Sequence, residues 1–148
     1  MKISMKSDYG VRAVLDLALH YGQGLTQSAD IAARQGVPEP YLDQLLTVLR
    51  KAGIVRSTRG PKGGHALARL PAEVTLGEVI NALEGTLSPI ACVDDPHLLH
   101  LCKQSGECVQ REVWQQVKEA MDKVLDETTI ESLAKRHAAR ESQPMYYI

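Results

Sequence analysis

The chain has 148 residues, a formal net charge of −1 and a hydrophobic content of 44%. This length fits one domain, or one domain with an extension, and no apolar run approaches the length of a membrane span. Because residues 1–6 contain no continuous apolar stretch, we expect no signal peptide and a cytoplasmic protein.

Charge is distributed unevenly along the chain. Residues 1–70 carry 10 Lys and Arg against 5 Asp and Glu, whereas residues 71–148 carry 7 against 13. The N-terminal half is therefore the electrostatic candidate for a nucleic-acid surface, although most charged faces are merely solvated.

Three short helices are predicted before residue 53. Ser7 is the expected N-cap of the first, whose apolar residues recur at helical spacing to about residue 21. The second follows Thr26 or Ser28 and stops at Gly36, and the third begins near Pro40 with its leucines facing inward. Two short helices joined by a glycine-containing turn are the helix-turn-helix pattern, so the third helix is the candidate recognition helix.

The outward face of this third helix offers polar groups to a major groove. The amide of Gln44 can pair bidentately with adenine. Tyr41 is expected on the same face, with core packing as its alternative role. The outward residues are predicted to be Glu39, Tyr41, Asp43, Gln44, Thr47 and Arg50.

A basic hairpin is predicted directly after the recognition helix. Gly53 is expected to end the helix, and residues 54–57 and 66–69 can each form a short strand. Between them, residues 59–64 read RGPKGG, a composition typical of an exposed turn. A helix followed by a basic hairpin indicates a winged helix, with an ordinary surface hairpin as the alternative.

The chain is expected to continue with one short helix and a polar connection. Thr75 and Glu78 form the pattern of a capping box, which opens a helix that Gly85 ends. Residues 87–93 are predicted to be short and extended, and residues 94–107 to be irregular.

The longest helix is predicted over residues 109–126. Its apolar residues form one stripe that needs a partner, which a second copy of the chain or the chain's own domain would supply. Thr128 or Thr129 is expected to cap a final helix through about residue 140, and residues 141–148 are expected to form a loose tail.

Several of these strings resemble one protein family. The segments SDYGVRAVLDLA (7–18), YLDQLL (41–46), LRKAGIV (49–55) and RGPKGG (59–64) resemble the first helix, recognition helix and wing of the Rrf-two type transcriptional regulators. This is the family of the iron–sulfur regulator IscR, the nitric-oxide sensor NsrR and the iron regulator RirA. The resemblance covers about residues 1–140 and departs at His65, where the family usually has Tyr; this departure bears on how the wing packs.

The resemblance implies a mainly α, winged helix-turn-helix homodimer that binds a double-stranded DNA operator. The implied organisation is a DNA-binding domain over 1–85, a cysteine loop over 86–108, a dimerisation helix and C-terminal helix over 109–140, and a flexible tail over 141–148. The implied DNA-binding residues are Pro40, Tyr41, Gln44, Arg56, Arg59, Lys62 and Gly63.

Chemistry agrees with these wing assignments. An arginine such as Arg59 can enter a narrow, electronegative minor groove. Lys62 and Arg56 would add phosphate attraction that weakens as salt rises. Gly63 and Gly64 would let the backbone approach closely.

Three cysteines, Cys92, Cys102 and Cys108, lie within 17 residues. In a cytosolic chain, clustered cysteines more often bind metal or respond to redox state than form a disulfide framework. By resemblance, they stand where sensing members hold an iron–sulfur cluster, either [4Fe–4S] or [2Fe–2S], and thiolates are suitable soft ligands for it. Free thiols and a zinc site are the alternatives.

A fourth cluster ligand must come from outside the cysteines. Arg111 stands where the IscR-like pattern has a His, and its side chain cannot ligate iron. Asp8 matches the acidic residue that the NsrR-like pattern takes from the partner subunit, with stabilisation of the helix N-terminus as its alternative role. The first two cysteines are farther apart than is usual in the family, and two histidines between them are reserve ligands: His97 and His100.

The sequence shows no nucleophile–base constellation and no Gly-rich phosphate loop at a strand–helix junction, so we do not expect an enzyme. The expected function is a DNA-binding regulator that senses redox state, nitric oxide or iron through a cluster held by the three cysteines and Asp8 of the partner subunit. The alternative is a winged-helix regulator with cluster-free thiol or zinc sensing.

Overall fold

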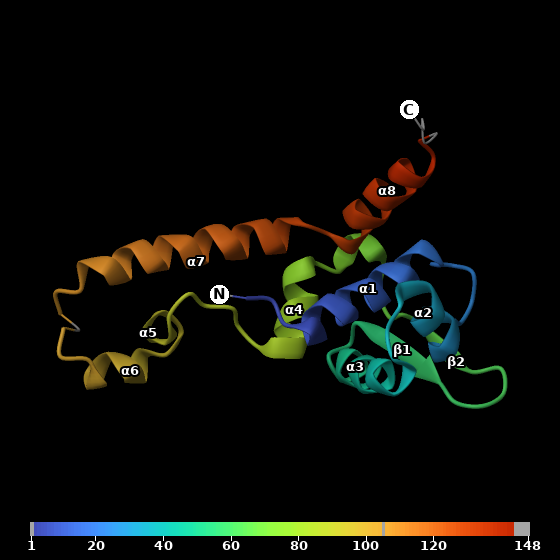
Figure 1. Ribbon diagram of the computed structural model, residues 1–148, viewed down its shortest axis with the longest axis horizontal. Coiled ribbons are helices and arrows are strands. Elements are labelled where there is room, and N and C mark those ends of the chain that lie inside the picture. The colour runs from blue at the N-terminus through green and yellow to red at the C-terminus, as the bar shows by residue number, and fades with distance from the viewer. Residues whose placement is uncertain (1, 105, 144–148) are drawn as a thin grey trace.

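A helical body and a long helical arm make up the molecule in the computed structural model, which describes residues 2–104 and 106–143 (Figure 1). The body contains helices α1 to α4, a two-stranded hairpin and α8, and the arm contains α5, α6 and α7. The predicted fold class, mainly helical with one small hairpin, is confirmed.

Helix α1 (Met5–Leu19) begins earlier and ends earlier than predicted. Ser4 is its N-cap and accepts a hydrogen bond from the backbone N–H of Ser7, which is itself fully buried, so the prediction of Ser7 as the cap is wrong. The reason is tertiary, because Glu84 accepts hydrogen bonds from the backbone N–H of Ser4 at 3.1 Å and from its hydroxyl at 2.6 Å.

The helix-turn-helix is formed by α2 (Ser28–Gln35) and α3 (Glu39–Lys51), as predicted. Gly36 ends α2 with a φ of 63°, a left-handed conformation that favours glycine. Pro40 lies in the first turn of α3, where its missing N–H has no helical partner to lose.

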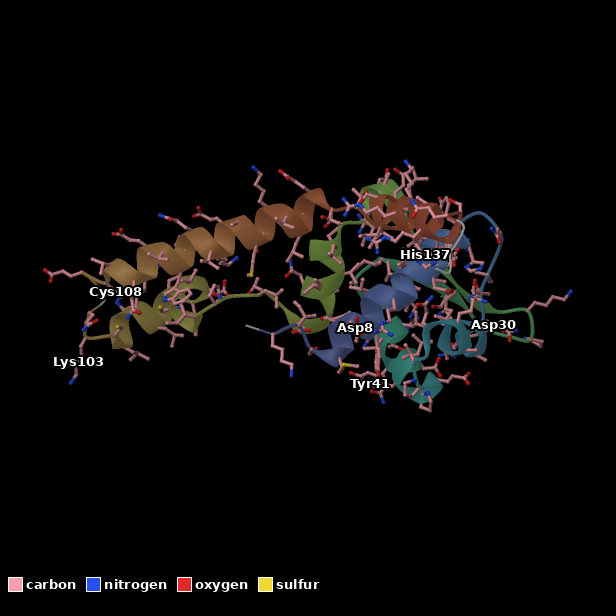
Figure 2. The ribbon with its side chains drawn as sticks, turned by 45° about the horizontal axis from the view of Figure 1, so that its top comes forward. Asp8, Asp30, Tyr41, Lys103, Cys108 and His137 are labelled. Atoms are coloured by element: carbon pink, nitrogen blue, oxygen red, sulfur yellow. The ribbon has the colours of Figure 1, made fainter. Side chains whose placement is uncertain are left out.

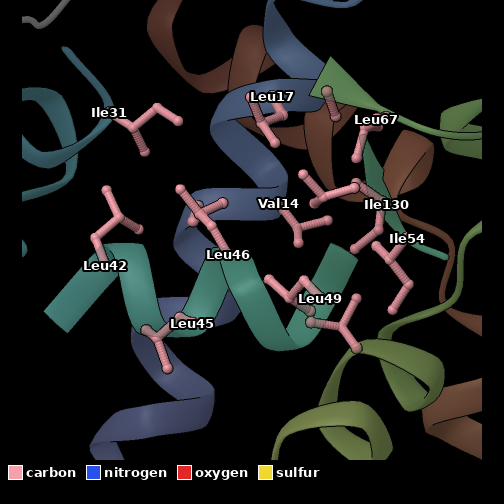
Figure 3. Packing of buried hydrophobic residues seen from close by; sticks show 14 of the residues in the cluster. Val14, Leu17, Ile31, Leu42, Leu45, Leu46, Leu49, Ile54, Leu67 and Ile130 are labelled. Atoms are coloured by element: carbon pink, nitrogen blue, oxygen red, sulfur yellow. The ribbon is translucent and has the colours of Figure 1, made fainter. Parts of the chain in front are cut away.

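The core lies where α3 packs against α1 (Figure 3). The four leucines that the pattern placed inward on α3 are all buried, and burying one such side chain contributes about 1.5–3 kcal/mol. Segments distant in sequence complete the cluster. Its large buried members include Val14, Leu17, Ile31, Leu42, Leu45, Leu46, Leu49, Ile54, Leu67 and Ile130.

The hairpin pairs β1 (Val55–Thr58) with β2 (Gly64–Leu67) in antiparallel register, Val55 opposite Leu67. The predicted strands were displaced by one residue and by two. Strand β2 begins early because His65 exchanges two backbone hydrogen bonds with Thr26, at 2.7 and 2.8 Å, which holds its start extended.

Two further elements connect the hairpin to the arm. The short 3₁₀ helix η1 (Pro71–Glu73) leads to α4 (Leu76–Glu84), and both reciprocal hydrogen bonds of the predicted capping box are present. Gly85 ends α4 as expected.

The arm contains two short helices that were not predicted. Residues 91–94 form α5 (Ala91–Asp94) and residues 96–101 form α6 (Pro96–Leu101), so the extended and irregular predictions for these residues are wrong. The Asp95 side chain caps α6 by accepting from the N–H of His97 at 2.9 Å, and Pro96 fits the first helical position.

The arm returns to the body through α7 (Val109–Glu127), which matches the predicted long helix. Thr129 then caps α8 (Ile130–Glu141), which packs against α1 and buries Ile130 in the core. Of the predicted tail, residues 144–148 lie outside the described residues. None of the helices described combines the length and the hydrophobicity needed to cross a membrane.

Candidate functional site

The outward face of α3 and the turn of the hairpin lie on one surface, which we call the α3–wing surface. We define it by the exposed residues of α3 and the turn over residues 59–63. A hollow of about 340 Å³ joins its parts and is bordered by the start of α2, by Glu39 at the start of α3, and by Gly60 and Pro61 in the turn. The fold therefore presents one helix and one loop together on a surface of the basic half of the chain.

Most of the side chains predicted to contact DNA are exposed. Pro40 and Gln44 are exposed on α3, and Arg59 and Lys62 flank the outermost part of the turn. Arg56 lies apart from them, because it borders a different hollow together with His20. The structure thus groups the α3 and turn residues, and Arg56 does not border the hollow that joins them.

Tyr41 is half-buried and packs against α1. Its ring meets Tyr9 of α1 edge-on, with centroids 5.9 Å apart and planes at 77°. The guanidinium of Arg12 lies 5.7 Å from the centroid of the Tyr9 ring and forms an ion pair with Asp8 at 2.8 Å. The first turn of α1 is therefore connected side chain by side chain to the first turn of α3.

Gly63 is buried inside the hairpin turn. A Cβ atom there would collide with the carbonyl oxygen of Thr58 and come within 2.9 Å of Gly60. Only a residue without a side chain allows the two limbs of the turn to come this close, so Gly63 shapes the turn that carries Arg59 and Lys62.

His65 joins the hairpin to the helix-turn-helix. Its Nδ1 lies 2.7 Å from the hydroxyl of Ser57 on β1, and its Nε2 lies 3.0 Å from the hydroxyl of Ser28 on α2. Burial lowers the pKa of His65, the nearby Asp43 raises it and Arg50 lowers it, with a net lowering. The sequence marked His65 as a departure from the family, but neither serine partner was predicted.

The cysteines lie on three neighbouring elements of the arm. Cys92 lies in α5, Cys102 follows α6 and Cys108 precedes α7; Cys102 is exposed and the other two are half-buried. Across residues 2–104 and 106–143, no three His, Cys, Asp or Glu side chains converge closely enough to hold a metal ion. Figure 2 shows Cys108 toward the far end of the arm and Asp8 in the body.

Two polar contacts that the sequence did not reveal hold α5 against α7. The Nε of Arg111 donates to the carbonyl of Cys92 at 3.3 Å, and the ammonium of Lys118 lies 3.7 Å from the carboxylate of Asp94. A hydrogen bond to Asp122 raises the pKa of Lys118, and the charge of Asp94 raises it further. The Lys118–Asp122 spacing is visible in the sequence, but the two contacts across the arm depend on the chain reversal between α5 and α7.

The apolar stripe predicted on α7 is uncovered in the single chain. No residue of α7 is buried, and Val109 and Val124 keep 78% and 63% of their surfaces exposed. An apolar groove of about 580 Å³ runs along the part of the stripe near the body, lined by Ile3, Leu87, Val117, Ala120, Met121, Val124 and Leu125.

Comparison with known proteins identifies the family behind this arrangement. The family model described as Rrf2, iron-dependent transcriptional regulator, matches residues 3–136. The chain belongs to the Rrf2 family of transcriptional regulators. The resemblance drawn from the helix, recognition-helix and wing strings is therefore confirmed, and membership of this family implies DNA binding.

Three relatives within the Rrf2 family show how far the similarity extends. CymR of Bacillus subtilis is 38% identical over 148 residues, all of both chains. Its structure, described as that of the global cysteine regulator, has a TM-score of 0.79 and covers 92% of this chain and 98% of its own. The structure of IscR of T. potens is 41% identical in sequence, has a TM-score of 0.76, and covers 99% of this chain and 97% of its own. The structure of oxidized CymR of Staphylococcus aureus is 35% identical, has a TM-score of 0.73, and covers 91% of this chain and 97% of its own.

Proposed function

We propose that this protein is a homodimeric DNA-binding regulator whose affinity for its operator depends on the state of the cysteine arm. The observation that carries the proposal is the α3–wing surface, where one exposed helix face and one basic turn adjoin in the positively charged half of the chain. This pairing suits a duplex, because a helix fits a major groove and an extended basic loop reaches the neighbouring groove and backbone.

The residues of this surface have distinct proposed roles. Gln44, and Tyr41 with its exposed part, face base edges in the major groove, and Pro40 lies beside them at the start of α3. Arg59 enters the minor groove from the turn that Gly63 shapes. Lys62 and Arg56 attract phosphates without regard to sequence, so their share of the affinity falls as salt rises.

We assign dimerisation to the exposed stripe of α7. Covering this stripe with the same stripe of a second copy would remove apolar side chains from water on both subunits. The arm also extends away from its own body (Figure 1). In such a dimer, the cysteines of one subunit would approach the body of the other and its first helix.

The donor atoms of the arm fit an iron–sulfur cluster in chemistry. Three thiols supply soft ligands within one short segment, and Asp8 of the partner subunit would supply an oxygen as the fourth. In this proposal Cys92, Cys102 and Cys108 hold the cluster, which when bound would make the arm responsive to oxidants, nitric oxide or iron supply. Since the thiols do not converge in the described residues, binding requires the segment over α5 and α6 to rearrange.

Contacts of α1 supply a route from Asp8 to DNA. With the carboxylate paired to Arg12, the guanidinium lies over Tyr9, whose ring packs against Tyr41 on α3. If Asp8 turns toward a partner's arm, Arg12 loses its ion pair and this edge of α3 is free to shift. Two half-sites must lie about 34 Å apart or a multiple of that, so a small shift of each α3 changes the affinity for both together.

The second candidate is a regulator that senses through free thiols without a cluster. In a variant of this candidate, the same residues hold zinc. Exposed Cys102 and half-buried Cys92 and Cys108 are accessible to oxidants or metal ions. One relative supports this reading by its description, which is of an oxidized form of CymR.

The deciding experiment combines spectroscopy with DNA binding. Protein purified without oxygen is examined for visible charge-transfer absorption and for iron, sulfide and zinc content, and its affinity for operator DNA is measured before and after cluster removal. Asp8→Ala is compared with Asp30→Ala, which removes an exposed first-turn carboxylate from another helix.

We expect iron and sulfide in matching amounts, faster cluster loss in Asp8→Ala than in Asp30→Ala, and a change of DNA affinity on cluster loss. A colourless, iron-free protein after anaerobic reconstitution would leave thiol or zinc sensing. Unchanged cluster stability and DNA affinity in Asp8→Ala would exclude the proposed coupling. No specific DNA binding in any state would refute the proposal as a whole.

A further inference from the structure

A polar brace connects the wing to the body at His65. The imidazole lies between two hydroxyls on different elements, that of Ser57 on β1 at 2.7 Å and that of Ser28 on α2 at 3.0 Å. The backbone of the same residue exchanges two hydrogen bonds with Thr26, immediately ahead of α2. One residue of β2 therefore contacts the other strand of the hairpin and the entrance of the helix-turn-helix.

The chemistry of imidazole suits this position. A neutral ring offers one N–H donor and one nitrogen acceptor on opposite sides, and a serine hydroxyl can act as either partner. His65 can therefore satisfy two serines at once. A tyrosine at this position would carry a single polar atom at its tip and could not replace both contacts.

The brace matters because Val55 and Leu67 anchor only the inner end of the hairpin in the core, whereas residues 56–62 toward the turn are exposed. An isolated two-stranded hairpin is marginally stable in water, and this one has only four residues in each strand. The turn with Arg59 and Lys62 projects beyond the strands and is exposed. Without a fixed base, the turn would sample many orientations, and DNA binding would have to bear the entropic cost of ordering it.

We propose that His65 is a positioning residue that fixes the orientation of the wing relative to α3, and so determines how Arg59 meets the DNA. This inference rests on the proposed contact between the wing and DNA. His65 itself acts through Ser57, Ser28 and the hairpin backbone and does not touch the bases.

A double-mutant cycle tests the inference. Affinity for one operator duplex is measured for wild type, His65→Ala, Arg59→Ala and the double variant, with His137→Ala on α8 as a matched histidine control. Losing two hydrogen bonds at the base of the wing is expected to weaken binding roughly tenfold in His65→Ala. In the Arg59→Ala background the same change should cost less than about twofold, because the wing no longer contributes its main contact.

Further readouts separate positioning from general destabilisation. Hydroxyl-radical footprints should lose minor-groove protection in His65→Ala and keep the remaining protection. Ser57→Ala, an exposed and milder change, should reproduce part of the loss, and should add little to His65→Ala. His65→Gln, whose amide keeps one donor and one acceptor, should recover part of the affinity.

Three results would overturn the inference: wild-type affinity in both His65→Ala and Ser57→Ala, losses from His65 and Arg59 that simply multiply, or a footprint weakened evenly over the whole site. If Arg59→Ala alone binds like wild type, the proposed wing contact fails, and the role of His65 fails with it. If Arg59→Ala binds weakly while both brace variants bind normally, only the positioning role fails.

Discussion

Asp16 shows how one buried charge can organise the start of the helix-turn-helix. Only 1% of its surface is exposed, and its two oxygens accept from Arg34 at 2.9 and 2.8 Å and from Gln35 at 3.1 Å. Burial alone would raise the pKa of Asp16, but the hydrogen bonds from Arg34 and Gln35 and the charge of Arg34 outweigh it, and the pKa lies below its ordinary value of 3.8. The folded state therefore favours the ionised carboxylate, which fixes α2 against α1.

The sign of the pH dependence follows from that lowered pKa. A carboxyl whose pKa is depressed by folding stabilises the protein fully above its unfolded pKa and loses this contribution as pH falls through the folded pKa. Asp16→Asn should lower the free energy of unfolding by about 2 kcal/mol at pH 7. The difference from wild type should shrink below about pH 4 in urea unfolding experiments.

Glu131→Gln is the matched control, because it breaks an exposed pair with Lys135 one turn away on α8. Such a pair contributes roughly 0.5 kcal/mol or less. A pH-independent difference between wild type and Asp16→Asn, or equal effects of the two variants at pH 7, would contradict this account of Asp16.

Among the helices and strands, sequence patterns predicted the structure correctly where the stabilising interaction lies within one helix or one turn. The leucine spacing of α3, the Thr75–Glu78 capping box and the glycine ends of α2 and α4 depend on neighbours three or four residues apart, and all were predictable. The hydrogen bonds between Ser4 and Glu84 could not be predicted, because the two residues lie 80 positions apart in the sequence. The brace at His65 was hidden for the same reason, since Ser28 lies 37 residues from it.

In the arm, the ion pair between α7 and α5 leads to a testable prediction. Lys118 on α7 reaches Asp94 on α5 and also pairs with Asp122, and only 17% of its side chain is exposed. Lys118→Met keeps the length and apolar stem of the side chain and removes the charge. We expect amide hydrogen exchange over residues 91–94 to accelerate about fivefold, because α5 then opens more readily.

Lys135→Met, which breaks a pair within α8, is the control for this experiment. It should leave exchange in α5 unchanged. Equal exchange of α5 in Lys118→Met and wild type would show that the ion pair does not hold it. Faster exchange throughout the chain would show that the substitution loosened the whole fold.

For the whole molecule, the uncovered stripe of α7 predicts how assembly and DNA binding are linked. Val124 lies in the apolar groove near the body and keeps 63% of its surface exposed in the single chain. A glutamate there would be buried without a partner in a dimer, at a cost of several kcal/mol. Val124→Glu should therefore sediment as a monomer at concentrations where wild type is a dimer.

Loss of the dimer in Val124→Glu should also lower the affinity for operator DNA. When one subunit of a dimer is bound, the second subunit is held near the adjacent half-site at a high effective concentration. A monomer lacks this advantage, so Val124→Glu should bind an operator with two half-sites about 100-fold more weakly. Its affinity for a single half-site should stay close to that of a wild-type subunit, because α3 and the wing are folded within one chain.

Gln115→Glu adds the same charge about two and a half helical turns earlier, on the opposite side of α7, and should remain a dimer. A monomer that keeps full operator affinity would separate dimerisation from DNA binding, whereas a dimer that tolerates glutamate at position 124 would move the interface away from this stripe.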